Sequence, residues 1–181
     1  FLKSSAAVLE RFGAKPPPGG DGPGLTFEAS MEACGSLQPP REVAVELRDY
    51  QLVGLRWLAA MHCCGVNAIL ADEMGLGKTL QTIALLAHLK FTLGEAGPHL
   101  VVAPLSTLPH WERELSLWTN LYWINFHGSA DCRRVIQQYE WLQSDKVAKG
   151  HEQYRFHVLL CNYETVVQDP EALQSVKWHY M

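Results

Sequence analysis

A glycine-rich loop at residues 72–79, with the sequence D-E-M-G-L-G-K-T, constrains the fold of this chain more than any other feature. The short apolar stretch Ala68–Ala71 precedes the loop, and a helical pattern of apolar residues that starts at Leu80 follows it. An apolar strand, a glycine-rich loop, Gly-Lys-Thr and a helix, in this order, are typical of a phosphate-binding loop. The sequence therefore predicts a strand–loop–helix unit that binds a nucleoside triphosphate with magnesium.

Each residue type in the loop suits this chemistry. Gly75 and Gly77 allow the backbone to turn tightly and to approach the phosphates, so that backbone N–H groups converge on the anion. Lys78 supplies a positive charge for the β- and γ-phosphates, and Thr79 offers its hydroxyl to Mg²⁺. We therefore expect ATP and Mg²⁺ as ligands, with Lys78 and Thr79 serving the reaction and Thr79 binding the metal. The loop residues predicted to line the nucleotide are Asp72, Glu73, Met74, Gly75, Leu76, Gly77, Lys78, Thr79 and Leu80.

The loop departs from the general pattern G-x-x-x-x-G-K-[ST] at its first position, where the chain has Asp72 followed by Glu73. Two carboxylates beside a phosphate site are unfavourable unless they point away from it or meet a cation. The pattern leaves open where these two carboxylates point. The alternative interpretation is an ordinary strand–turn–helix with a surface lysine, which gives no reason for the glycines to stand where they do.

Composition narrows the range of functions. The chain has 181 residues, of which 48% are hydrophobic and 19% charged, and its formal net charge is −4. These values are typical of a globular domain, and they confine any nucleic-acid surface to a local patch. No apolar run reaches membrane-spanning length, so no membrane partner is expected. Five irregularly spaced cysteines argue against a disulfide framework, and His62-Cys63-Cys64 lacks zinc-site spacing and predicts a buried helix end.

The chain divides into a linker and a folded part. Residues 15–40 are rich in proline and glycine, which predicts a disordered linker at 1–41 and a folded domain at 42–181. Short apolar strands then alternate with helices, which predicts an α/β fold, a parallel sheet with helices on both faces and a ligand site at the carboxyl ends of the strands. Strands are expected at 68–71, 99–103, 122–127, 156–161 and 176–181, and helices at 47–61, 78–93, 106–118, 130–142 and 164–168.

Four stretches resemble motifs of the switch/sucrose-nonfermenting (SNF) type of DNA translocase, a branch of the superfamily 2 helicases. They are L-R-D-Y-Q-L-V-G-L-R-W-L at 47–58, I-L-A-D-E-M-G-L-G-K-T-L-Q-T at 69–82, G-P-H-L-V-V-A-P-L-S-T-L with W-E-R-E at 97–114, and F-H-V-L-L with Y-E at 156–164. In this family an aspartate at the Asp72 position is normal. The sequence of these stretches is most similar to that of the chromodomain-helicase-DNA-binding (CHD) remodelers, and imitation-switch and lymphoid-specific remodelers share much of it.

The resemblance implies a recombinase-A-like ATPase lobe and a role for each matching position. Arg48, Tyr50 and Gln51 would lie at the adenine, and the glycine-rich loop would hold the phosphates and Mg²⁺. The residues implied to lie along a DNA strand are Pro104, Leu105, Ser106, Thr107 and Tyr163. The match at Cys161-Asn162 departs from the hydroxyl-bearing residues of the family, which weakens DNA contact there.

The same residues also have ordinary structural interpretations. Gln51 could belong to a solvated helix face, Ser106 and Thr107 could cap a helix, and Trp111 suits a protein core better than a base stack. These alternatives stay open at the level of sequence.

The resemblance also marks what the printed sequence does not contain. In this family a D-E-A-H or D-E-G-H box follows a tryptophan such as Trp178, and a second lobe supplies an arginine finger. The chain reaches Met181 without that box. Because the box holds magnesium and activates the attacking water, we expect the chain to bind ATP weakly and not to hydrolyse it.

The leading hypothesis is thus the ATP-binding part of a nuclear, ATP-dependent chromatin remodeler. Its expected partners are duplex DNA, nucleosomes and the second ATPase lobe. The alternative from another class is a truncated, non-hydrolysing nucleotide-binding product or pseudoenzyme. An RNA helicase usually has A-x-T-G-x-G-K-T in this loop, which disfavours that class, and a small-molecule P-loop kinase would not explain the motif at 47–58.

Overall fold

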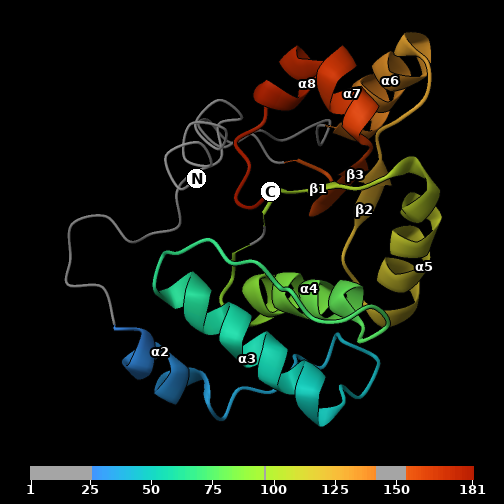
Figure 1. Ribbon diagram of the computed structural model, residues 1–181. Coiled ribbons are helices and arrows are strands. Elements are labelled where there is room, and N and C mark those ends of the chain that lie inside the picture. Colours follow the sequence, from blue (N-terminus) through green and yellow to red (C-terminus); the bar gives the residue numbers. More distant parts are fainter. Residues whose placement is uncertain (1–25, 96, 142–153) are drawn as a thin grey trace. The chain divides into compact units, whose positions relative to one another are not determined.

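The computed structural model describes residues 26–95, 97–141 and 154–181 (Figure 1). The chain divides into two compact units. Among these residues, the helical unit comprises 26–95 and Glu114–Asn120, and the sheet unit comprises Gly97–Arg113, 121–141 and 154–181. No helix in the described ranges has the length and apolar character needed to cross a membrane.

The helical unit is built from α2 (Phe27–Cys34), α3 (Asp49–Cys63) and α4 (Lys78–Ala87), which continues as the π-helical turn η1 (His88–Thr92). α2 packs on α3, and α3 packs on α4 (Figure 1). Apolar residues at helical spacing form the core between them, as the sequence predicts. Its fully or almost fully buried members include Leu55, Ala59, Ala60, Ile83, Ala84, Ala87 and Leu89.

Both ends of α3 follow from local chemistry. At its start, the side chain of Gln51 accepts a hydrogen bond from the Arg48 N–H at 3.0 Å, which satisfies one of the free donors of a helix N-terminus. At its end, Gly65 adopts a positive φ of 68°, and the N–H groups of Gly65 and Val66 donate to the carbonyls of His62 and Met61. This pair of bonds is a Schellman motif. The predicted helix end at Gly65 is confirmed.

The predicted linker extends too far. Within it, Phe27–Cys34 forms α2, whose first turn is capped by the Thr26 hydroxyl accepting from the Ala29 N–H at 3.3 Å. Ser30 and Cys34 are buried on the face that meets α3. The proline- and glycine-rich surroundings hide this short amphipathic segment from a composition-based boundary. Ordered structure therefore begins before residue 42, and residues 1–25 of the predicted linker lie outside the described residues.

The predicted strand Ala68–Ala71 is wrong. The segment from Val66 to Glu73 has no ladder partner among the described residues. Ile69, which the pattern places in a buried strand, is 77% exposed. An apolar run favours a strand, but the strand exists only where a neighbour accepts and donates its backbone hydrogen bonds. Here the segment is an exposed connection that leads from α3 into the glycine-rich loop.

The sheet unit holds β1 (His99–Val102), β2 (Trp123–Asn125) and β3 (Val158–Cys161) in the order β1-β3-β2. Both pairings are parallel, and Leu159 of β3 stands opposite Leu100 on one side and Ile124 on the other. The predicted α/β class with a parallel sheet is confirmed. The strand expected at 176–181 is reduced to one parallel bridge between Tyr180 and His99.

Helices and an aromatic core complete the sheet unit. The helical elements are η2 (Leu105–Thr107), the first half of α5 (Leu108–Trp118), α6 (Ala130–Ile136), η3 (Gln137–Trp141), α7 (Tyr163–Gln168) and α8 (Pro170–Gln174). From Glu114 on, α5 belongs to the helical unit. Trp141 packs edge-to-face on Phe126 and Phe156, with ring centroids 4.9 and 5.5 Å apart. Trp178 is fully buried, and its indole N–H donates to the Leu173 carbonyl at 2.8 Å. α6, α7 and α8 lie on the same side of the sheet (Figure 1).

Candidate nucleotide and DNA sites

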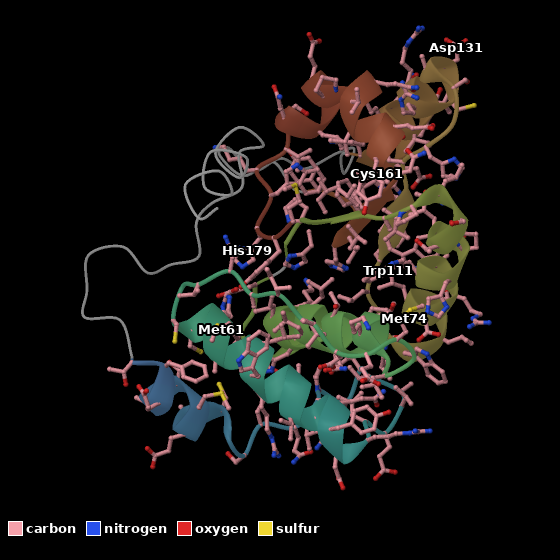
Figure 2. The ribbon with its side chains drawn as sticks, in the orientation of Figure 1. Met61, Met74, Trp111, Asp131, Cys161 and His179 are labelled. Atoms are coloured by element: carbon pink, nitrogen blue, oxygen red, sulfur yellow. The ribbon has the colours of Figure 1, made fainter. Side chains whose placement is uncertain are left out.

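The backbone of the glycine-rich loop has the shape that a phosphate-binding loop needs. Gly75 and Gly77 both have positive φ values, 88° and 78°, which only glycine adopts without strain. Gly77 occupies the cap position of α4, so the free N–H groups of the first helical turn open directly onto the loop. Met74 stands at the tip and is 96% exposed (Figure 2). The loop thus presents backbone donors and a helix N-terminus to an anion.

Lys78 folds back over this loop. Its ammonium donates to the carbonyl oxygens of Asp72 and Glu73, at 2.8 Å each. These carbonyls orient the only cation of the loop within reach of an anion bound there. A phosphate oxygen would compete with them for the same three ammonium protons. The structure thus holds the Lys78 ammonium over the loop, and its role as a phosphate ligand stays a prediction.

Gln51 joins the motif at 47–58 to the loop. Its side chain is only 7% exposed, and its amide donates to the Leu76 carbonyl at 3.3 Å while its oxygen accepts from the Arg48 N–H. The interpretation of Gln51 as part of a solvated face is wrong. Gly77 is also close to this amide, since a Cβ built on Gly77 would lie 2.4 Å from Gln51 Nε2. Two sequence motifs therefore meet at one residue.

The other two residues predicted at the adenine are exposed. Arg48 and Tyr50 are exposed at the start of α3, and Arg48 Nη1 donates to Tyr50 Oη at 3.4 Å. The structure thus places Gln51 against the loop and leaves the other two predicted adenine residues on the surface of the same unit.

Gln81 is a site residue to which sequence reasoning gives no role. It lies one turn into α4, is fully buried, and donates to Asp72 Oδ2 at 3.1 Å and to the Leu76 carbonyl at 3.4 Å. The Asp72 carboxylate is therefore turned toward a buried amide, which answers the question raised by its place in the loop. A polar amide at a position of α4 with core spacing is the signal that could have found it.

The predicted DNA residues gather at one edge of the sheet unit. Pro104–Thr107 follow β1 and are all exposed, and Tyr163 follows β3 and is also exposed. Since β1 and β3 are parallel neighbours, both segments leave the sheet at its carboxyl edge, where the Ala103 N–H donates to the Cys161 carbonyl at 3.0 Å. The Thr107 hydroxyl donates to the Pro104 carbonyl at 2.8 Å and closes η2. The structure therefore brings these segments together.

The residues that depart from the family pattern face inward. Cys161 is fully buried, and Asn162 uses its side-chain oxygen to accept from the N–H and the hydroxyl of Thr165, at 3.0 and 2.5 Å. Neither side chain can reach a nucleic acid at the surface. Trp111 lies on α5 (Figure 2) and is partly buried.

The cysteine-rich end of α3 is only partly as predicted. His62 is buried, but Cys63 is exposed. Cys64 donates to the Ser30 hydroxyl at 3.3 Å, and all five cysteines are free. Burial, with the Cys63 thiol alongside, raises the pKa of Cys34 to about 11.

Comparisons with known proteins agree with this geometry. The SNF2-related domain matches residues 50–181 of the chain. The chromatin-remodeling ATPase INO80 of Candida glabrata is 44% identical over 147 residues, which cover 81% of this chain and 10% of that protein. Chromodomain-helicase-DNA-binding protein 8 of Danio rerio is 45% identical over 136 residues, which cover 74% of this chain and 5% of that protein. The chain thus spans a tenth or less of these curated relatives.

A solved structure confirms the fold. The Sulfolobus solfataricus SWI2/SNF2 ATPase core in complex with dsDNA superposes with a TM-score of 0.64 and 34% sequence identity, over 80% of this chain and 26% of that chain. The predicted recombinase-A-like ATPase fold is thereby confirmed. CHD proteins are among the relatives, and INO80 proteins match at nearly the same identity, so the resemblance is shared between these remodelers. The chain belongs to the SNF2-related domain family.

Proposed function

We propose that this chain is the ATP-binding part of an ATP-dependent chromatin remodeler motor. The observation that supports this most is the convergence of two family motifs on one loop carbonyl, that of Leu76, beside the positive-φ glycines and Lys78. The relatives named above are a chromatin-remodeling ATPase and a chromodomain-helicase-DNA-binding protein. The same loop in an unrelated strand–turn–helix would not need Gln51 of α3 to hold it.

In the proposed site, α4 and the loop bind the triphosphate. Backbone N–H groups of residues 75–80 and the Lys78 ammonium bind its phosphates, and the hydroxyl of Thr79, in the first turn of α4, binds Mg²⁺. Arg48, Tyr50 and Gln51 lie at the start of α3 for the adenine. The residues fit these groups because two glycines leave the loop backbone bare and a lysine is already held over it. When bound, Mg²⁺ neutralises phosphate charge.

The proposed DNA surface is the carboxyl edge of the sheet unit. The exposed segment Pro104–Thr107 and the exposed Tyr163 offer hydroxyl and backbone N–H groups, which suit phosphate contacts rather than base readout. In the complete protein this surface would track duplex DNA, act on nucleosomes in the nucleus and work with a second ATPase lobe. A Ser106→Glu change should weaken duplex binding and flatten its salt dependence, because it places an anion against the phosphate backbone.

Titration of the 181-residue chain with a fluorescent ATP analogue and Mg²⁺ tests the nucleotide site. We expect saturable binding that Lys78→Ala weakens by about tenfold or more, the equivalent of one charge-assisted hydrogen bond. Lys90→Ala, on the η1 continuation of the same helix, is the matched control and should bind like the unaltered chain. Equal affinity for the Lys78 and Lys90 variants would refute the proposed site.

We propose further that the 181-residue chain by itself binds ATP without hydrolysing it. The printed sequence holds no D-E-A-H or D-E-G-H box, and hydrolysis needs a carboxylate that activates water beside the metal. A phosphate-release assay should show no turnover above background. Turnover that disappears in Lys78→Ala would contradict this and would assign the activation of water to a residue of this chain.

A further inference from the structure

Gln81 occupies a position with three neighbours inside the helical unit. It comes from α4, it contacts the loop at Asp72 and Leu76, and it packs against Gly54 of α3. Its side chain has no exposed surface. A buried amide in an otherwise apolar helix face carries a desolvation cost that its hydrogen bonds must offset.

The hydrogen bonds of Gln81 fix which way its amide points. Both N–H protons have acceptors, one on the Asp72 carboxylate and one on the Leu76 carbonyl. The amide oxygen is buried and has no hydrogen-bond partner. The reverse orientation would set that oxygen against the carboxylate and leave both acceptors without a donor, which costs more. Asp72 thus selects the orientation of Gln81.

Gly54 makes room for this arrangement. A Cβ added to Gly54 would lie 1.8 Å from Oε1 of Gln81 and 2.9 Å from its Cδ, far inside contact distance. Gly54 therefore leaves the space that the end of the Gln81 side chain occupies, and an alanine there would force that amide to move.

We propose that Gln81 is a positioning residue of the nucleotide site. Its amide holds the Asp72 carboxylate toward the α3–α4 interface, away from bound phosphates, and holds the Leu76 carbonyl in place so that the following N–H groups face the anion. Gln51 donates to the same carbonyl from the other helix. This inference rests on the proposed ATP site and names the residue that makes an aspartate tolerable at the start of the loop.

Exchanging the two polar groups tests the proposal. In Gln81→Glu two carboxylates of unchanged size face each other, and we expect affinity for the fluorescent ATP analogue to fall by about tenfold. Asp72→Asn places an amide donor where the carboxylate stood. The double variant restores a donor–acceptor pair between positions 72 and 81 in the opposite sense and should recover part of the loss, since the Leu76 carbonyl still lacks its donor from α4. A space-filling role for Gln81 would predict no such recovery.

A second pair of variants separates positioning from folding. Gly54→Ala should lower the melting temperature, because the added methyl group collides with Gln81. Gly54→Ala with Gln81→Ala removes the collision and should restore much of the melting temperature while nucleotide affinity stays low. This pair keeps the test valid if Gln81→Glu alone does not fold.

The outcomes distinguish the two proposals. Unchanged affinity in Gln81→Glu, no recovery in the folded double variant, or full affinity in Gly54→Ala with Gln81→Ala would overturn the positioning role while the ATP site stands. Binding by the unaltered chain that does not depend on Lys78 would overturn the ATP site itself.

Discussion

Arg133 of α6 holds Asp169, at the start of α8, through a hydrogen bond of 3.0 Å from its Nε to Oδ2. Its Nη1 also donates to the Gly128 carbonyl at 2.6 Å, and the side chain is almost fully buried. One guanidinium therefore ties together the loop before α6 and the junction of α7 and α8.

Removing the carboxylate of this pair should destabilise the fold. Asp169→Ala leaves a buried guanidinium short of one partner, and we expect the free energy of unfolding to fall by about 2 kcal/mol, less than for a fully buried pair because Asp169 is partly exposed. Urea denaturation measures the change. Asp131→Ala is the control: Asp131 pairs with Arg134 at 3.2 Å on the surface of α6 (Figure 2), and this change should leave stability unaltered. Equal losses for the two variants would contradict the prediction.

The two loop glycines should differ in their tolerance of alanine. Gly75 has open space around its α-carbon, so Gly75→Ala adds only the strain of a positive φ, about 1 kcal/mol. Gly77→Ala adds the same strain and also places a methyl group 2.4 Å from Gln51 Nε2, which displaces the amide from the Leu76 carbonyl. We therefore expect the larger loss of melting temperature and of nucleotide affinity in Gly77→Ala. The reverse order would show that Gln51 does not support the loop.

His88 should make stability sensitive to acid. Burial lowers the pKa of His88 from its ordinary value of 6.5, the nearby His62 lowers it further and Glu95 partly opposes them. Because the unfolded chain binds the proton more readily, the contribution of neutral His88 is complete above pH 6.5 and is lost as the pH falls through the lowered pKa.

Denaturation by urea at about pH 7.5 and about pH 5.5 tests this dependence. His88→Gln should lose less stability between the two pH values than the unaltered chain does, whatever its stability at neutral pH. The exposed His127 provides the control, and His127→Gln should keep the full loss. An unchanged pH dependence in His88→Gln would rule out the assigned group.

Thiol reactivity should follow burial. Burial raises the pKa of Cys161 to about 12, from 9.0, so almost none of this thiol is ionised at about pH 8. Exposed Cys132 and Cys63 should therefore react with a maleimide first, and Cys161 should react only when β3 unfolds. Mass spectrometry of the labelled peptides after increasing times gives the order. Labelling of Cys161 as fast as Cys132 in the native chain would contradict its place in the core.

The sequence predicts an element correctly where residues close together in the chain determine its start or end. The buried strand at 158–161, the helix that starts at Lys78 and the helix end at Gly65 all follow from patterns within a few residues. The expected strand at 68–71 fails because strand formation depends on a neighbour that an apolar run cannot specify. α8 was missed although Pro170 stands at its first turn, a common helix start.

The site residues also fall into those that local spacing predicts and those that depend on the packing of α3 and α4. Gly75, Gly77 and Lys78 could be identified from spacing because their roles depend on the backbone of one loop. The sequence assigns Gln51 to the site only through the family resemblance, and it gives Gln81 no functional role. Their partners are fixed by how α3 and α4 lie against the loop, which no local pattern records.

The Leu76 carbonyl accepts from an amide on α3 and from another on α4, so both of its lone pairs have donors from outside the loop. The conformation of residues 72–79 therefore depends on the Gln51 and Gln81 side chains that donate to this carbonyl. The same eight residues placed in a different protein would keep the sequence of the motif but lose these two hydrogen bonds. The segment from Arg48 to Gln81 contains both donors to this oxygen, the Gln51 and Gln81 amides, and also the Arg48 N–H, which donates to the Gln51 side chain.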